Sequence, residues 1–194
     1  MKSLAVFCGS QFGTNPLHTE LAHNLGAAMA QRDITLVYGG GRVGLMGVIA
    51  TAVMEAGGKV IGVIPQSLAE KEIAFEAATE LIVVGTMHQR KAIMADRADA
   101  FVALPGGYGT CDELFEILTW AQIGIHAKPI ALLNVAGFYN PLLAMVDHLT
   151  AEGFIRPQHR ALLHNVNTLP QLFALLEQVH PVEPIEKWAM PDER

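Results

Sequence analysis

Charged side chains are scarce in this chain of 194 residues: Asp, Glu, Lys and Arg make up 16% of it, against 51% hydrophobic residues. Such a composition excludes intrinsic disorder and allows one domain with a sizeable core. The net charge is -6, and no block of basic residues occurs. Because nucleic-acid surfaces need clustered Lys and Arg, we expect no nucleic-acid partner. A small phosphorylated ligand remains compatible, since backbone amides and one or two cations can hold it.

Cysteine is also rare, with only Cys8 and Cys111. Two cysteines do not make a disulfide framework, which favours a reducing cytosol. No apolar run is long enough to predict a membrane span, and Gly9 and Ser10 end the first apolar stretch too early for a signal peptide. The histidines show no metal-binding spacing such as H-E-x-x-H. We therefore expect a cytoplasmic protein with no membrane partner, no metal and no cofactor.

Short apolar runs alternate with longer amphipathic stretches along the chain. The runs are apolar on both faces, as in buried parallel strands. Expected strands cover residues 4–8, 34–38, 60–64, 80–84, 100–104 and 129–133, and expected helices cover 16–31, 46–56, 88–98, 110–123, 140–152 and 169–179. This alternation predicts an α/β fold, a Rossmann-like doubly wound three-layer sandwich with a mostly parallel sheet. We expect one nucleotide-binding domain over residues 1–180 and a loosely held tail over 181–194.

A first glycine-rich turn follows the expected strand 34–38. Gly39, Gly41 and Gly44 fit the G-x-G-x-x-G spacing of dinucleotide folds. That fingerprint also needs an acidic residue about 20 positions on, and residues 60–65 contain none, which argues against NAD. A P-loop is excluded because no Lys follows Gly44. Two alternatives remain: Gly40 and Gly41 let a phosphate or sugar approach the backbone, or the turn is tight and holds no ligand.

A second glycine-rich turn follows the expected strand 100–104, where Pro105 ends the strand. Gly106, Gly107 and Gly109 permit backbone angles that other residues avoid. We expect Thr110 to open the next helix. The free N–H groups at a helix start attract anions, so this segment predicts a phosphate cradle.

The same segment has a purely structural interpretation. Thr110 and Glu113 have the spacing of a capping box, with Thr at the N-cap and Glu three residues on. Asp112 and Glu113 would also favour any helix N-terminus electrostatically. From these residues alone, Glu113 is either a capping residue or a catalytic carboxylate.

Taken together, the motifs resemble those of a known family. Residues 105–113 match P-G-G-x-G-T-x-x-E, and residues 87–91 match M-H-x-R-K. The first turn matches Y-G-G-G-x-x-G-L-M-G over residues 38–47, and residues 6–10 and 119–122 are also similar. These are motifs of the lonely-guy family of cytokinin-activating phosphoribohydrolases, which are often mislabelled lysine decarboxylases. The resemblance extends from about residue 3 to about residue 180.

The resemblance implies a Rossmann-like homodimer with active sites near the subunit interface. Its substrates would be nucleoside 5′-monophosphates, often N6-modified adenylates, cleaved to free base and ribose 5-phosphate. Arg90 and Glu113 match the family's catalytic pair. Cys111 and Asp112 depart from the Leu-Glu common in plant members, which puts the base preference in doubt. Positions that match the family's ligand contacts are Glu72, Lys91, Gly107, Tyr108, Gly109, Thr110, Cys111, Asp112, Glu113 and Thr119.

Cleavage of a C1′–N bond builds positive charge on the ribose, which a fixed carboxylate such as Glu113 can stabilise. Arg90 suits the phosphate or Glu113 as partner, or is an exposed helix cation. Lys91 points about 100° away from Arg90 on a helix, which weakens its case. Glu116 is a second carboxylate or, more simply, a solvated helix acid. Glu72, in an expected polar loop, would hold base or ribose or only face solvent.

The residues leave three alternatives to hydrolysis by Glu113: a carrier, a lysine decarboxylase and an enzyme with a cysteine nucleophile. A non-catalytic nucleotide carrier can share the fold, since fold does not determine function. Lysine decarboxylation needs a lysine that forms a Schiff base with pyridoxal phosphate, and Lys91 already belongs to the M-H-x-R-K segment. Cys111 lies near an expected helix N-terminus, where reactive cysteines occur. A nucleophilic role also needs a nearby histidine, which the sequence does not place beside it.

Overall fold

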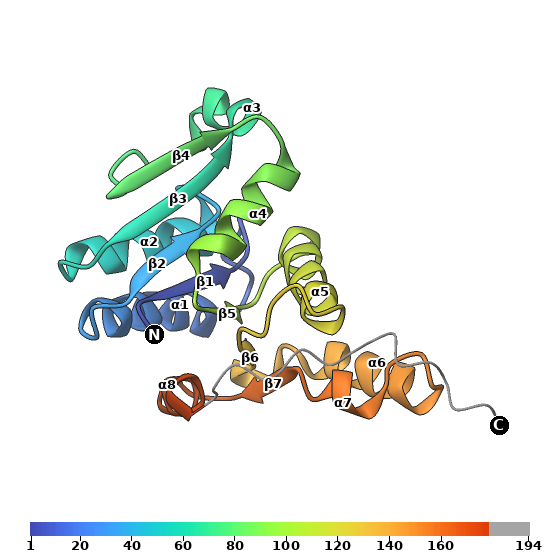
Figure 1. Cartoon of the computed structure of the whole chain (residues 1–194). Helices are drawn as coiled ribbons and strands as arrows, with labels where there is room; N and C mark the ends of the chain where they lie inside the picture. The colour runs from blue at the N-terminus through green and yellow to red at the C-terminus, as the bar shows by residue number, and fades with distance from the viewer. Residues whose placement is uncertain (179–194) are drawn as a thin grey trace.

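The computed structural model describes residues 1–178, and these contain a seven-stranded parallel sheet of order β4-β3-β2-β1-β5-β6-β7 (Figure 1). The predicted Rossmann-like α/β fold is confirmed, and the sheet is parallel throughout. Residue 179, the expected end of the last helix, and the expected tail over 181–194 lie outside the described residues. The strands are β1 (Ser3–Phe7), β2 (Thr35–Tyr38), β3 (Val60–Pro65), β4 (Glu80–Val84), β5 (Ala100–Ala103), β6 (Ile130–Leu133) and β7 (Leu163–Val166).

Helices cover both faces of the sheet and make the three layers (Figure 1). Side chains of α1, α2 and α8 share one hydrophobic core with the sheet, and those of α4 and α5 share a second core on the opposite face. The helices are α1 (Leu17–Ala30), α2 (Gly44–Glu55), α3 (Gln66–Leu68), α4 (Met87–Arg97), α5 (Tyr108–Gln122), α6 (Asn140–Ala151), α7 (Pro157–Arg160) and α8 (Leu169–Gln178), with a π-helical turn η1 (Ala69–Ile73) and a 3-10 turn η2 (Val135–Gly137).

The central strand β1 shows why the strands are apolar on both faces. Leu4 and Val6 pack into the core beneath α1 and α2, whereas Ala5 and Phe7 pack into the core beneath α4 and α5. Successive side chains of a strand point to opposite faces, so a strand covered on both sides needs apolar residues at every position. All four side chains are at most 3% exposed.

Five short elements were not expected from the sequence: α3, η1, η2, α7 and β7. The edge strand β7 carries His164, which is half-buried, and Asn165, which is exposed, so it lacks the continuous apolar run of an inner strand. The single-turn helix α7 begins at Pro157 and is too short to show helical periodicity. In addition, Glu72 lies in the π-helical turn η1, so the expected loop at this position was wrong.

The sheet changes direction of winding between β1 and β5. From β1 the chain runs outward through β2 and β3, and from β5 it runs the other way through β6 and β7 (Figure 1). Loops at the carboxyl ends of β1 and β5 therefore diverge, which leaves a crevice between them. The second glycine-rich turn follows β5 and lies at this point.

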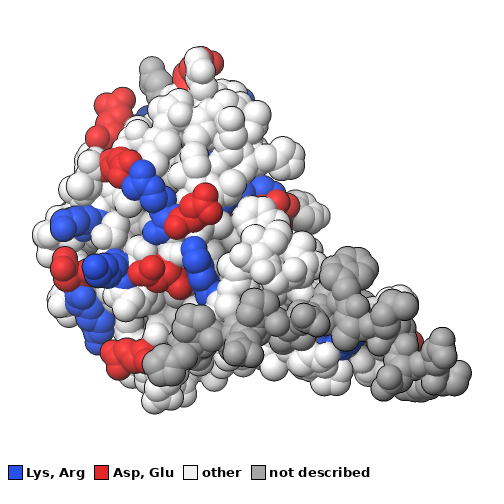
Figure 2. Space-filling model, viewed as in Figure 1, with Lys and Arg blue, Asp and Glu red and all other residues white. Residues whose placement is uncertain are grey.

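Figure 2 shows one face of the molecule, on which basic and acidic side chains are interspersed. Several lysines and arginines on that face lie next to acidic residues, so no broad basic surface forms there. Within residues 1–178, no helix combines the length and the hydropathy needed to cross a membrane.

Candidate active site

Arg90 and Glu113, 23 positions apart in the sequence, form an ion pair in the fold. Arg90 is in the first turn of α4 and Glu113 is in the second turn of α5. Their Nη1 and Oε1 atoms are 2.8 Å apart, with side chains 10% and 8% exposed. The sequence alternative of an exposed helix cation at position 90 was therefore wrong.

The Arg90 side chain is held in place by backbone as well as by Glu113. Its Nε donates a hydrogen bond to the Val63 carbonyl at the end of β3, over 3.1 Å. It also passes close to Gly39, where a Cβ atom would lie 1.8 Å from the Arg90 Nη2 atom. Glycine at position 39 thus leaves the space in which the guanidinium lies.

Burial raises the pKa of the Glu113 carboxyl, although the guanidinium of Arg90 acts in the opposite direction. The Cys8 thiol at the end of β1 is also buried, and burial, followed by the nearby charge of Glu113, raises its pKa. A carboxyl with a raised pKa beside a cation is a recurrent arrangement in sites that transfer protons. The raised pKa of the Cys8 thiol keeps it protonated and unreactive.

The predicted capping box at Thr110 was wrong. Helix α5 begins at Tyr108 with Gly107 as its N-cap, because the Cys111 N–H bonds to the Gly107 carbonyl over 3.1 Å. Thr110 is therefore inside the first turn and packs against Gly106, where a Cβ atom would lie 2.0 Å from the Thr110 hydroxyl oxygen. Glu113 does not cap α5, because its carboxylate pairs with Arg90 and it lies six residues after the Gly107 N-cap.

The capping box of this site lies instead at the start of α4. Thr86 accepts a hydrogen bond from the Gln89 backbone N–H, and the Gln89 side chain accepts one from the Thr86 N–H, both over 3.2 Å. This box fixes the helix start from which Arg90 extends. Helix α5, in contrast, has no side-chain cap, so the N–H groups of its first turn are free to bind an anion.

Lys91 points away from Arg90 and binds two other acids of α5. Its Nζ atom is 3.1 Å from Asp112 Oδ2 and 3.0 Å from Glu116 Oε2. Burial alone would lower the pKa of Lys91, but hydrogen bonds to Glu116 and Asp112 raise it overall. Glu116 is therefore a partner of a buried lysine, and the expectation of a solvated helix acid was wrong.

Other residues of the chain occupy the space beside the first glycine-rich turn. Gly40 has a φ of +74°, and a Cβ atom there would lie 2.9 Å from the Ile64 side chain. Gly41 makes an isolated bridge with Ala74, and the Gly40 carbonyl accepts a hydrogen bond from Phe75 over 2.9 Å. Both glycines are buried, and their close neighbours are β3, the segment after η1 and the Met46 side chain of α2. Their predicted approach to a ligand stays a prediction.

A cavity of about 460 Å³ lies in the crevice between β1 and β5. The Gly9 N–H bonds to the Pro105 carbonyl over 3.0 Å and so ties the two loops together. Sequence reasoning missed most of its lining, although the position after β1 at the switch point was a signal that could have found it. The lining residues are Gly9, Ser10, Gln11, Phe12, Gly13, Thr14, His18, Leu45, Pro105, Gly106, Gly107 and Phe138.

The remaining predicted positions are more dispersed. Gly107, Tyr108 and Gly109 are exposed at the start of α5, and Tyr108 is 98% exposed. Cys111 is half-buried on the same helix and is a free cysteine. The backbone of Glu72 lies in η1.

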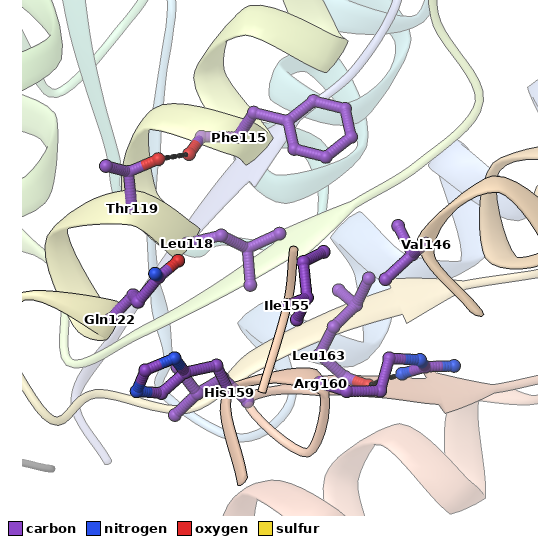
Figure 3. A pocket seen from close by; sticks show the side chains of 10 residues that line it. Phe115, Leu118, Thr119, Gln122, Val146, Ile155, His159, Arg160 and Leu163 are labelled. Atoms are coloured by element: carbon purple, nitrogen blue, oxygen red, sulfur yellow. Dashed lines mark hydrogen bonds between the residues drawn. The ribbon is translucent and has the colours of Figure 1, made fainter. Parts of the chain in front are cut away.

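Thr119 is six residues beyond Glu113 on α5, an axial rise of about 9 Å, and is exposed. Its hydroxyl donates a hydrogen bond to the Phe115 carbonyl over 2.7 Å (Figure 3). It borders a cavity of about 70 Å³ whose other walls include His159 and Arg160 of α7 (Figure 3). Within one chain, Thr119 therefore belongs to a different surface from the Arg90–Glu113 pair.

Known proteins that resemble this chain cover most of its length. Residues 46–176 match the family model described as "Possible lysine decarboxylase". The chain is 50% identical over 180 residues to cytokinin riboside 5′-monophosphate phosphoribohydrolase LOG2 of Arabidopsis thaliana, which covers 93% of this chain and 84% of that protein. It is 52% identical over 181 residues to the probable phosphoribohydrolase LOGL9 of Oryza sativa subsp. japonica, covering 93% and 80%.

Solved structures share the fold at lower sequence identity. The Moco carrier protein of Chlamydomonas reinhardtii has a TM-score of 0.68 at 24% identity, covering 91% of this chain and 95% of that one. The molybdenum cofactor binding protein of Rippkaea orientalis has a TM-score of 0.69 at 22% identity, covering 90% and 94%. The motifs, the fold and the extent of identity agree, and the chain belongs to the family of LOG phosphoribohydrolases that carries the "Possible lysine decarboxylase" description.

Proposed function

We propose that this protein hydrolyses the N-glycosidic bond of nucleoside 5′-monophosphates, with N6-modified adenylates as the preferred class, and releases free base and ribose 5-phosphate. The observation that carries the proposal is the buried ion pair between Arg90 of α4 and Glu113 of α5, with 2.8 Å between Nη1 and Oε1. The uncapped start of α5 follows the second glycine-rich turn. Relatives about 50% identical to this chain are named for this reaction on cytokinin riboside 5′-monophosphates.

The site can support hydrolysis by stabilising the positive charge that develops at C1′ of the ribose. As the C1′–N bond breaks, its electron pair leaves with the base and the ribose becomes positively charged. The carboxylate of Glu113 stabilises that charge and takes a proton from the water that adds to C1′, while the leaving base gains a proton. Arg90 positions the carboxylate, and the N–H groups at the start of α5 hold the 5′-phosphate. In this proposal, Lys91 orients α5 through its two ion pairs.

The remaining substrate contacts are proposed from the family positions. Gly107, Tyr108, Gly109 and Thr110 line the phosphate side, with Cys111 and Asp112 one turn further along the helix. Glu72 contacts the base or the ribose, and the first turn, with Gly40 and Gly41, shapes the adjoining backbone. We propose no metal and no cofactor for the reaction. Two free thiols, Cys8 and Cys111, support action in a reducing compartment such as the cytoplasm.

We also propose that the active protein is a homodimer. Thr119 matches a ligand-contacting position of the family but lies on another surface of α5 from Glu113. A second copy that packs on α5 would supply its Thr119 to the first copy's site. Large apolar side chains near the ends of α5 and α6 support such an interface, since Ile125 is 62% exposed and Phe154 is 79% exposed.

Lysine decarboxylation fits the site poorly. A Schiff-base lysine must lose its proton, which requires a lowered pKa. Lys91 has the opposite environment, because Glu116 and Asp112 hold it as a cation and raise its pKa.

The test is direct incubation of purified protein with AMP and with N6-isopentenyl-AMP, followed by chromatography of the free base. We expect cleavage of both, and faster cleavage of the modified nucleotide. If no nucleoside monophosphate yields free base while calorimetry shows binding, the chain is a carrier and the proposal is wrong.

A further inference from the structure

The cavity between β1 and β5 has walls of contrasting chemistry. Among the residues that the structure describes, its lining includes no Asp or Glu, and His18 is its only ionisable side chain. Phe12, Leu45 and Phe138 supply apolar surface. Its volume of about 460 Å³ is within the range of small-molecule sites, roughly 300–1,000 Å³. A cavity without acidic walls is suited to a ligand that carries negative charge.

His18 is the polar side chain that is most enclosed in this cavity. It lies in the first turn of α1 and is only 8% exposed. Its ring packs edge-on against Phe138, with centroids 5.4 Å apart at 80°. Nδ1 faces the loop after β1, since a Cβ atom on Gly13 would lie 3.0 Å from it.

No residue that the structure describes forms a hydrogen bond with the His18 ring. The ring nitrogens of His18 are not fully buried, so they are open to the cavity that the side chain lines. A ligand in the cavity can therefore supply their hydrogen-bond partner. The aromatic contact with Phe138 meanwhile fixes the plane of the ring, so the imidazole is oriented before a ligand arrives.

Another part of the cavity wall favours an anion. Gly106 and Gly107 line it and lead into α5, whose first turn has no side-chain cap. The N–H groups there carry partial positive charge. An anion at this helix start is therefore within the same cavity as the imidazole of His18.

We propose that His18 binds the 5′-phosphate of the nucleotide, donating a ring N–H to a phosphate oxygen, together with the N–H groups at the start of α5. This assignment rests on the proposed function, and it adds α1 to the elements that bind substrate. The phosphate is then held between the loop after β1 and the turn after β5, while Glu113 acts on C1′ from the second turn of α5.

Binding measurements test this without turnover. Inorganic phosphate and ribose 5-phosphate are titrated by calorimetry into the wild-type chain and into the variants His18→Gln and His18→Phe. We expect the Kd of both ligands to rise about tenfold or more in each variant, as for a lost hydrogen bond to a charged group. The matched control is His23→Gln, on an exposed position of the same helix, which leaves both Kd values unchanged. Adenosine, which lacks the phosphate, binds the wild type and the His18 variants equally.

NMR of the wild-type chain with histidine labelled with ¹³C at Cε1 detects phosphate binding at His18 directly. Misfolding of a variant cannot produce this signal change. The His18 signal is the one missing from the His18→Phe spectrum, and we expect it to shift as phosphate is added to the wild type. Wild-type Kd values in both His18 variants, a His18 signal unmoved at phosphate saturation, or a loss confined to adenosine would each overturn the assignment. Phosphate binding through His18 with no cleavage of any nucleotide would instead overturn the proposed function alone.

Discussion

At the scale of single residues, Glu113 is a carboxyl group kept in an environment that disfavours its charge. Burial raises its pKa above the ordinary value of 4.5 even with Arg90 beside it. A group whose folded pKa is raised favours folding below its unfolded pKa and opposes it as the pH rises through the folded value. Ionised Glu113 therefore lowers the stability of the folded chain at neutral pH, as active-site groups often do.

The variant Glu113→Gln imitates the protonated carboxyl. We expect its free energy of unfolding to equal that of the wild type near pH 4 and to exceed it increasingly as the pH rises above 4.5, because only the wild type ionises there. Its turnover of AMP should fall at least about 10²-fold, the usual effect of a lost general base. Urea denaturation at several pH values measures the first effect. A variant less stable than the wild type at pH 8 would show that Glu113 ionises favourably.

Gly39 illustrates a residue whose role is to leave space. A Cβ atom there would overlap the Arg90 guanidinium, and a side-chain end can move where backbone cannot. We expect Gly39→Ala to displace Arg90 and to lower kcat by about 10²-fold, as for a misplaced catalytic group. Its melting temperature should stay within about 4 °C of the wild type.

Gly85→Ala is the comparison for Gly39→Ala, because a Cβ atom at this exposed position lies near only the Gln89 side chain. It should retain wild-type turnover. Equal kcat in Gly39→Ala and the wild type would mean that the Arg90 position does not matter for the reaction.

At the scale of elements, the start of α4 determines where Arg90 and Lys91 lie. We expect Thr86→Ala, which removes the capping box, to lower the free energy of unfolding by about 1 kcal/mol. Thr150→Ala, which removes a hydroxyl bonded only to the Val146 carbonyl within α6, should change it by less than about 0.5 kcal/mol. Urea denaturation compares the two. The same loss in both variants would show that this cap has no particular effect.

The contact between α4 and α5 depends on Lys91. Glu116 is 21% exposed and Asp112 is 59% exposed, so the pair with Glu116 is the less screened by water. We expect Glu116→Gln to cost about 2 kcal/mol of stability and Asp112→Asn less than about 1 kcal/mol. Chemical denaturation in low and high salt measures both. A larger loss in Asp112→Asn would reverse this order.

These elements also show what the sequence can reveal. Inner strands such as β1 were predictable because burial on both faces demands continuous apolar runs. The start of α5 was not, since Thr110 has a capping residue's identity while the Gly107 carbonyl accepts the first helical bond. Motif resemblance indicated Arg90 and Glu113 as a pair, but only the fold brings them to 2.8 Å. The cavity around His18 depends on three loops, and the sequence signal for it was limited to the position of one of them after β1 at the switch point.

At the scale of the whole molecule, the order of the strands brings the candidate catalytic and binding residues together at the carboxyl ends of the central strands. The loops after β1 and β5 diverge there, and α5 begins beside them (Figure 1). Helix α4 begins after the edge strand β4 and meets α5 through the Arg90–Glu113 ion pair. Thr119 of the same chain lies away from this site. Light scattering should therefore give twice the chain mass of 20.9 kDa, as a two-fold symmetric dimer requires.

Mixed dimers test whether Thr119 acts across the interface. We expect Thr119→Ala and Glu113→Gln to be weakly active as separate homodimers. In a dimer containing one chain of each, one site would combine an intact Glu113 with the partner's intact Thr119, and the other site would lack both. Co-expression in equal amounts makes about half of the dimers mixed, each with one intact site, so total activity should approach about a quarter of the wild-type value. If both residues acted within one chain, mixing would restore nothing, and activity would stay at the mean of the two homodimers.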